Sequence, residues 1–191
     1  MINVGILALQ GSVVEHRKCL EQLEGITITE VKDAGALETV DCIILPGGES
    51  TTIGKLLREF SILDPLKRRI EDGMPVWGTC AGLILLAKTI VNEDTVHLGL
   101  MDISVRRNAY GNQLDSFLDH AVIPEVSDTP IPLVFIRAPW IESAGKNVDI
   151  LLRHRDKIVM AREGNMLVTS FHPELTEDLS IHRYFVNMIK K

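Results

Sequence analysis

The sequence feature that most constrains the fold is a turn of small residues between two apolar runs. Residues 78–82, GTCAG, follow the run MPVW at 74–77 and precede the run LILLA. A strand that bends sharply into a helix forces its central residue into a strained backbone conformation and needs small neighbours. The pattern predicts a nucleophile elbow centred on Cys80. The positive end of the helix dipole favours a reactive thiolate there, and the alternative is a buried, inert cysteine.

Apolar runs of strand length alternate with helical patterns through residue 90. Residues 2–9, 26–31 and 42–45 have the composition of buried strands, and apolar residues at helical spacing follow the first and third of them. Ser12 and Glu15 have the spacing of a capping box at the start of the first helix. This alternation predicts an α/β fold with a doubly wound, mostly parallel sheet, which binds its ligands at the carboxyl ends of the strands.

From about residue 98 the sequence changes to short β-like runs separated by turn residues, and an amphipathic helix closes the chain at 181–189. This half is therefore expected to contain more β structure. We find no internal repeat and no convincing linker. The 191 residues are expected to form one domain, 1–191.

His172-Pro173-Glu174 follows the apolar strand pattern that ends near Ser170. Proline disfavours helical geometry at the preceding residue, and in an extended chain residues two apart point the same way. Glu174 could then orient one nitrogen of His172 while the other faces a thiol, which is the logic of a catalytic triad. The alternative is a histidine that only closes a turn.

Two further segments could bind charged or polar groups. Gly47 and Gly48 end a strand and could turn their N–H groups toward one point, forming with the Ala81 N–H an oxyanion hole, although a plain Gly-Gly loop is the commoner case. Arg107 and Arg137 lie at expected strand ends, where a guanidinium could bind a carboxylate or only be solvated. These residues predict a Cys-His-Glu acyl-transfer enzyme acting on a small anionic or zwitterionic substrate.

Charge and cysteine content exclude several classes. A net charge of −6 argues against nucleic-acid binding, which depends on lysine and arginine neutralising phosphates. Three scattered cysteines form neither a disulfide framework nor a zinc site, so we expect a reducing, cytoplasmic environment and no metal. The chain begins without a basic leader, and no apolar run approaches the roughly 18 residues of a membrane span. No membrane partner is expected.

Several motifs together carry a family resemblance. The chain resembles the glutaminase subunits of pyridoxal 5′-phosphate synthase (the PdxT/SNO family), a branch of the class I (triad) glutamine amidotransferases. The resemblance spans the chain and rests on ALQGSVVEH, LPGGEST, GTCAGLILLA, the RRN segment, FIRAP and SFHPELTED. It implies a three-layer, flavodoxin-like fold whose C-terminal half adds antiparallel strands to the sheet.

The resemblance implies a role for each matching residue. Cys80 would be the nucleophile toward L-glutamine, His172 the general acid and base, and Glu174 its orienting partner. The implied glutamine-binding positions are Gly48, Glu49, Ser50, Arg107, Ile136 and Arg137. The family needs no cofactor in this subunit.

The resemblance also implies a partner. The ammonia would pass to a separate synthase (lyase) subunit, in a large hetero-oligomer, which makes the coenzyme from ribose 5-phosphate and glyceraldehyde 3-phosphate. The free glutaminase would be nearly idle until docking reorients the Gly47-Gly48 peptide. We expect Gln10 and the helix around His16 to make the activating contact, since both should lie at the same sheet edge.

Two other interpretations remain open from the sequence. One is another class I amidotransferase, or a peptidase-like hydrolase of the same fold family, although relatives without amidotransferase activity generally lack the His-x-Glu pair. The other is a non-catalytic docking subunit, against which the presence of Cys80, His172 and Glu174 argues.

Overall fold

A ten-stranded sheet forms the centre of the computed structural model, which describes residues 1–107 and 116–189. The strands follow the order β2-β1-β3-β4-β12-β11-β9-β6-β5, and β10 pairs with β11 beside this path. A separate hairpin is made by β7 and β8. The strands are β1 Ile2–Leu7, β2 Ile26–Val31, β3 Cys42–Leu45, β4 Val76–Thr79, β5 Ala87–Ile90, β6 Met101–Arg106, β7 Ser116–Ile123, β8 Ser127–Ile136, β9 Trp140–Ala144, β10 Asp149–His154, β11 Lys157–Glu163 and β12 Met166–Thr169.

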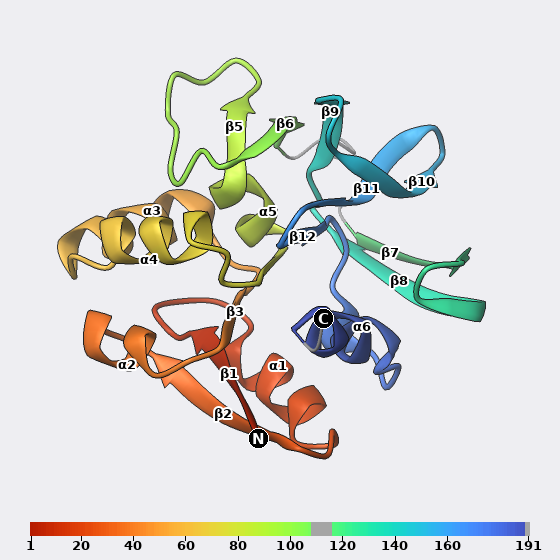
Figure 1. Cartoon of the computed structure of the whole chain (residues 1–191). Coiled ribbons are helices and arrows are strands. Elements are labelled where there is room, and N and C mark those ends of the chain that lie inside the picture. The colour runs from red at the N-terminus through yellow and green to blue at the C-terminus, as the bar shows by residue number, and fades with distance from the viewer. Residues whose placement is uncertain (108–115, 190–191) are drawn as a thin grey trace.

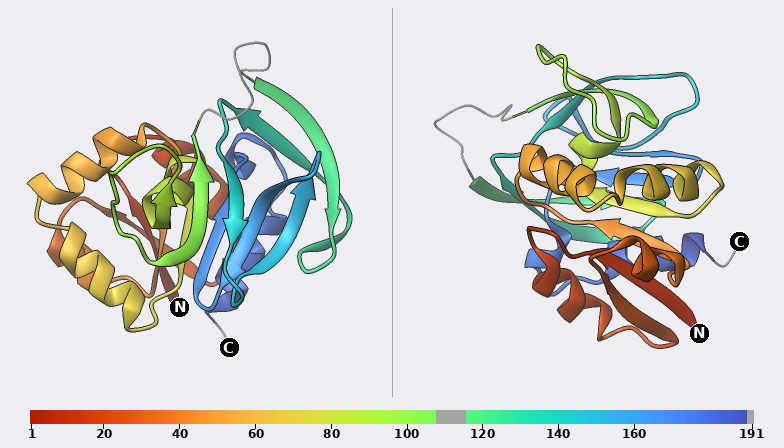
Figure 2. Two further views of the ribbon diagram at one scale, coloured as in Figure 1. Left: turned by 90° about the horizontal axis from the view of Figure 1, so that it is seen from above. Right: turned by 90° about the vertical axis from the view of Figure 1, so that its left-hand side faces the viewer.

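Helices cover both faces of the sheet, so the molecule has three layers (Figure 1). One apolar core packs α2, α3, α4 and α5 against the sheet, and a second core lies under α1, α6 and the β7–β8 hairpin. Figure 2 shows the same layers from two other sides. The helices are α1 Val13–Leu20, α2 Ala34–Glu38, α3 Ser50–Glu59, α4 Leu63–Glu71, α5 Ala81–Leu86 and α6 Ser180–Met188, with a 3-10 turn, η1, at Pro173–Leu175.

The parallel half of the sheet positions the predicted site. Strands β1, β3, β4 and β12 run in the same direction, with β4 between β3 and β12. Their carboxyl ends therefore lie at one edge of the sheet. The segments that follow these ends contain Gln10, Gly47, Cys80 and His172. The expected convergence of loops thus occurs, with β12 adding a fourth loop.

Most strand pairs of the C-terminal half are antiparallel, as the resemblance implied, whereas β12 pairs with β4 and β6 with β5 in parallel. Strand β11 pairs antiparallel with β12, β9 and β10, and β9 pairs antiparallel with β6. The predicted α/β fold with a mostly parallel sheet and added antiparallel strands is confirmed. Asn108, part of the RRN motif, lies outside the described residues.

Two helix starts differ from their predicted capping. Ser12 makes no capping hydrogen bond to α1, because its hydroxyl bonds to Glu174 instead. For α3 the sequence predicts Ser50 or Thr51 as the cap, but the cap is Glu49, whose carboxylate accepts a hydrogen bond from the N–H of Thr52. In both places a residue near the site uses its side chain in a way that local spacing does not reveal.

Candidate active site

Cys80 lies at a sharp turn between β4 and α5, as the elbow prediction requires. Its φ of 48° and ψ of −96° lie in a region that L-residues rarely occupy. Its N–H donates to the carbonyl of Thr169 on β12 at 2.8 Å. A side chain on Gly78 would collide with the backbone of Gly82, and one on Gly82 with the carbonyl of Leu45. These close contacts are the physical reason for the small residues of the elbow.

His172 and Glu174 form a buried pair two residues apart. His172 Nδ1 lies 2.7 Å from Glu174 Oε1, and the His172 backbone N–H donates to the Val134 carbonyl on β8. The backbone reaches this geometry differently from the expected extended segment. His172 is non-helical, with φ −109° and ψ 84°, and Pro173 then begins the 3-10 turn that carries Glu174. Because Nδ1 faces Glu174, Nε2 is the nitrogen left to exchange a proton with a thiol.

The charges of this pair stabilise each other. Burial opposes a positive charge on His172, but hydrogen bonding to Cys80 and Glu174 outweighs it and raises the pKa of His172 to about 10. Burial likewise opposes the negative charge of Glu174. The imidazoles of His16 and His172 and the hydroxyl of Ser12 outweigh that effect and lower the pKa of Glu174 to about 2. The arrangement favours an imidazolium held by a carboxylate beside the thiol.

A cavity of about 580 Å³ opens at the same sheet edge and includes nearly all of the predicted site residues. Glu174 and His16 are not among its lining residues. The predicted residues in its wall are Gln10, Gly47, Gly48, Glu49, Ser50, Cys80, Ala81, Arg107, Ile136, Arg137 and His172.

The turn at Gly47 is tied to the loop between β1 and α1. The Gly47 carbonyl accepts a hydrogen bond from the Ser12 N–H at 2.9 Å, and Gln10 Oε1 accepts one from the Glu49 N–H at 2.8 Å. A side chain on Gly11 would collide with the Gly47 carbonyl. Since a trans peptide points its N–H opposite to its carbonyl, the Ser12 contact also sets the direction of the Gly48 N–H.

One wall of the cavity is charged. Arg107 Nη2 lies 3.0 Å from Glu49 Oε1, and Arg107 Nη1 lies 3.2 Å from Glu93 Oε2. Burial opposes the charge of Glu49, but hydrogen bonds from Thr52 and the charge of Arg107 hold its pKa below the usual range. Ser50 Oγ is buried and has no hydrogen-bond partner among the described residues. This wall offers an anion, a cation and an unused hydroxyl to a small zwitterion.

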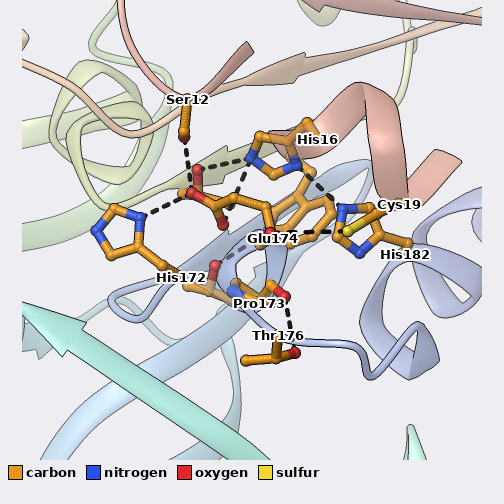
Figure 3. Close-up of polar contacts among 11 residues, drawn as sticks. Ser12, His16, Cys19, His172, Pro173, Glu174, Thr176 and His182 are labelled. Carbon is orange, nitrogen blue, oxygen red and sulfur yellow. Dashed lines mark hydrogen bonds and ion pairs between the residues drawn. The ribbon is translucent and has the colours of Figure 1, made fainter. Parts of the chain in front are cut away.

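The helix around His16 stays a predicted partner contact, but the His16 side chain itself does not reach that surface. His16 is fully buried and lies behind Glu174, with Nε2 3.6 Å from Glu174 Oε2 (Figure 3). The reason is that His16 is on the core-facing side of α1. Gln10, in the loop before α1, is exposed, and so is Val14 on α1. The surface of this segment therefore remains open to a partner.

Sequence reasoning missed three residues around the triad. Ser12 Oγ donates to Glu174 Oε1 at 2.7 Å, and His182 Nε2 lies 3.1 Å from His16 Nδ1. Glu93 pairs with Arg107. Ser12 carried only the signal of a helix cap, and nothing in the local sequence marks His182 or Glu93.

Residues 1–107 and 116–189 contain neither a candidate metal site nor a candidate membrane span. No group of three or more His, Cys, Asp and Glu side chains in these ranges could hold a metal ion. No helix in them is long and apolar enough to span a bilayer.

Comparison with known proteins gives close matches over the full length. The model of the SNO glutamine amidotransferase family matches residues 6–191. Pyridoxal 5′-phosphate synthase subunit PdxT of Clostridium botulinum is 56% identical over 191 residues, covering 100% of this chain and 99% of the relative. The subunit of the same name from Thermoanaerobacter sp. is 54% identical over 187 residues, covering 98% and 99%.

Solved structures show the same likeness. A crystal structure of a glutamine amidotransferase superposes with a TM-score of 0.92 at 45% identity, covering 98% of this chain and 99% of that one. PurLQS of Thermotoga maritima shares the fold at a TM-score of 0.71 and 16% identity, covering 97% of this chain and 98% of that one. The sheet with its site at the carboxyl edge is therefore the fold of glutamine amidotransferases.

Proposed function

We propose that this chain, which belongs to the SNO glutamine amidotransferase family, hydrolyses L-glutamine and delivers the ammonia to the synthase subunit of a pyridoxal 5′-phosphate synthase. It is a glutamine amidotransferase by family, and its full-length relatives are named as subunits of that synthase. The observation that supports the catalytic assignment is the presence of Cys80 and His172 in the wall of one cavity, with the buried Glu174 2.7 Å from His172 Nδ1.

The reaction proceeds in two covalent steps. The Cys80 thiolate attacks the side-chain amide carbon of glutamine, and His172 Nε2 gives its proton to the departing nitrogen, which leaves as ammonia. Water then attacks the glutamyl thioester while His172 takes its proton. Glutamate is released and the thiol is restored. Glu174 stabilises the positive charge of His172 and keeps Nδ1 engaged throughout.

The negative charge that develops on the amide oxygen needs N–H donors. The N–H of Ala81, which follows the nucleophile, and the Gly47-Gly48 turn are our candidates for this oxyanion hole. Losing one such donor typically lowers the rate by about a hundredfold or more.

Glutamine would bind against the charged wall. Glu49 would receive the α-ammonium group, and the guanidinium groups of Arg107 and Arg137 would bind the α-carboxylate. Ser50 would use its unpaired hydroxyl, and the backbone around Gly48 and Ile136 would complete the pocket.

Activation would act through the β1–α1 loop. Docking of the synthase subunit on Gln10 and the exposed side of α1 would move the Ser12 N–H that holds the Gly47 carbonyl, and the Gly47-Gly48 peptide would then turn. The functional unit would be one domain, 1–191, acting in a cytoplasmic hetero-oligomer.

The proposal is tested by measuring ammonia release from glutamine with and without the synthase subunit. We expect substantial activity only with the partner, and full turnover by the isolated chain would contradict the gating. Cys80→Ala should abolish hydrolysis and leave binding to the synthase subunit intact. Residual glutaminase activity in that variant would refute the role of Cys80.

A further inference from the structure

Two histidines outside the proposed mechanism are buried behind Glu174. His16 on α1 and His182 on α6 are both fully buried, and His16 Nδ1 lies 3.1 Å from His182 Nε2. Figure 3 shows them on the other side of the carboxylate from His172. Trp77 on β4 meets both rings edge-on, with centroid distances of 5.4 and 4.9 Å, which restricts how either ring can turn.

The two oxygens of Glu174 have different surroundings. Oε1 accepts a hydrogen bond from Ser12 and faces His172 Nδ1, each at 2.7 Å. Oε2 makes no hydrogen bond within the described part of the chain, and the polar group that faces it is His16 Nε2 at 3.6 Å. A buried carboxylate oxygen is costly without a donor nearby. The state of His16 Nε2 therefore matters to Glu174.

Burial decides the protonation of both rings. It lowers the pKa of His16 and lowers the pKa of His182 to about 3, so each ring is neutral at pH 7 and has one N–H. A bare His16 Nε2 would point its lone pair at a carboxylate. With the proton on Nε2, His16 Nδ1 must accept a hydrogen bond, and His182 Nε2 is placed to donate it. This leaves His182 Nδ1 bare, and that atom has no partner among the described residues.

We propose that His16 and His182 are positioning residues for glutamine hydrolysis: His182 fixes the tautomer of His16, which directs its Nε2–H toward Glu174 and keeps the carboxylate aligned with His172. The effect on glutamine hydrolysis rests on the proposed function. His16 Nε2 also lies 3.2 Å from the hydroxyl of Thr79, the residue before Cys80. One ring thus contacts the carboxylate and the strand that carries the nucleophile.

The test compares two substitutions of His182 in the complex with the synthase subunit. His182→Phe keeps a ring against Trp77 but removes the donor, whereas His182→Gln provides an amide N–H near the position of Nε2. Small misplacements of a catalytic group cost up to about a hundredfold in rate. We expect His182→Phe to lower kcat for glutamine hydrolysis by about tenfold or more with little change in KM. His182→Gln should restore most of the rate.

A second measurement does not depend on glutamine. The rate at which iodoacetamide alkylates Cys80 in the isolated chain, followed by mass spectrometry against pH, reports its thiolate. Burial raises the pKa of Cys19 to about 11 and also raises the pKa of Cys42, so neither thiol competes near neutral pH. We expect the alkylation midpoint of His182→Phe to lie at higher pH than that of wild type, because a displaced Glu174 no longer supports the imidazolium of His172.

Phe185→Leu is the matched control, because Phe185 packs on Trp77 one turn along α6 without joining the polar chain. It should destabilise the protein without shifting the alkylation midpoint. The inference is overturned if His182→Phe keeps the wild-type kcat and midpoint, or if Phe185→Leu at an equal loss of thermal stability reproduces both changes. If the wild-type complex releases no ammonia, the proposed function fails, while the alkylation result still decides the inference.

Discussion

Gly47→Ala should slow catalysis through a steric contact, while keeping every N–H of the turn. A methyl group on Gly47 would overlap His172 Cε1, lie 3.0 Å from His172 Nδ1 and lie 3.6 Å from Cys80 Cβ. Carbon atoms pack best at about 3.5–4.0 Å, so the imidazole must move by about 1 Å. That movement would strain the 2.7 Å contact between His172 and Glu174. A displacement of this size costs about a hundredfold in rate, equivalent to roughly 2.7 kcal/mol of transition-state stabilisation.

The assay is ammonia release by the variant in the presence of saturating synthase subunit, with glutamine varied to separate kcat from KM. We expect kcat to fall by about a hundredfold and the thermal midpoint to change little, since the turn lies at a cavity. Gly35→Ala is the control, because a methyl group there meets only the Asp33 side chain at 3.2 Å on the short helix α2. A kcat within threefold of wild type for Gly47→Ala would refute the steric contact between position 47 and His172 in the active complex.

Two further predictions concern stability and substrate binding. The pKa of His182 is 6.5 in the unfolded chain but about 3 in the folded chain, so the free energy of unfolding should fall as the pH drops from 6.5 toward 3. Folding also lowers the pKa of Glu174 from 4.5 to about 2, which should add to this fall below pH 4.5. Chemical denaturation at several pH values measures the free energy of unfolding, and its slope against pH between 6.5 and 4.5 should be smaller in His182→Phe. An equal slope in both proteins would contradict the contribution of His182. Arg107→Lys should raise KM for glutamine by about tenfold with kcat nearly unchanged, because a single ammonium cannot reproduce the fork that contacts both Glu49 and Glu93. Steady-state kinetics with the synthase subunit decide this, and an unchanged KM would remove Arg107 from the binding site.

The parts of the site that are local in sequence could be predicted from it. The elbow depends on residues within four positions of one another, and the His172-Pro173-Glu174 pair on residues two apart. Their geometry is set mainly by steric rules that act over one turn of the chain. The strand alternation similarly revealed the parallel half of the sheet and the edge at which the loops meet.

The parts that depend on distant contacts could not be predicted. Ser12 and Glu174 are 162 positions apart, and His16 and His182 are 166 positions apart. Locally Ser12 fits a helix cap, and His16 fits either a core position or an exposed contact. Only the packing of α1 and α6 on the same face of the sheet brings their polar groups to Glu174. The cap at Glu49 was missed for a related reason, since its carboxylate serves both α3 and Arg107.

The pairing of β4 with β12 has a consequence for how this enzyme can change over evolution. Thr79 and Thr169 are partners in register at the ends of neighbouring strands, and the proposed nucleophile, Cys80, and the proposed base, His172, follow them in the chain. Main-chain hydrogen bonds between β4 and β12 therefore set the separation between the Cys80 sulfur and the His172 imidazole. Any sequence compatible with the sheet will form these hydrogen bonds. Mutations can therefore accumulate in the surrounding loops and helices, altering regulation or the choice of partner, while the two reacting groups keep their distance.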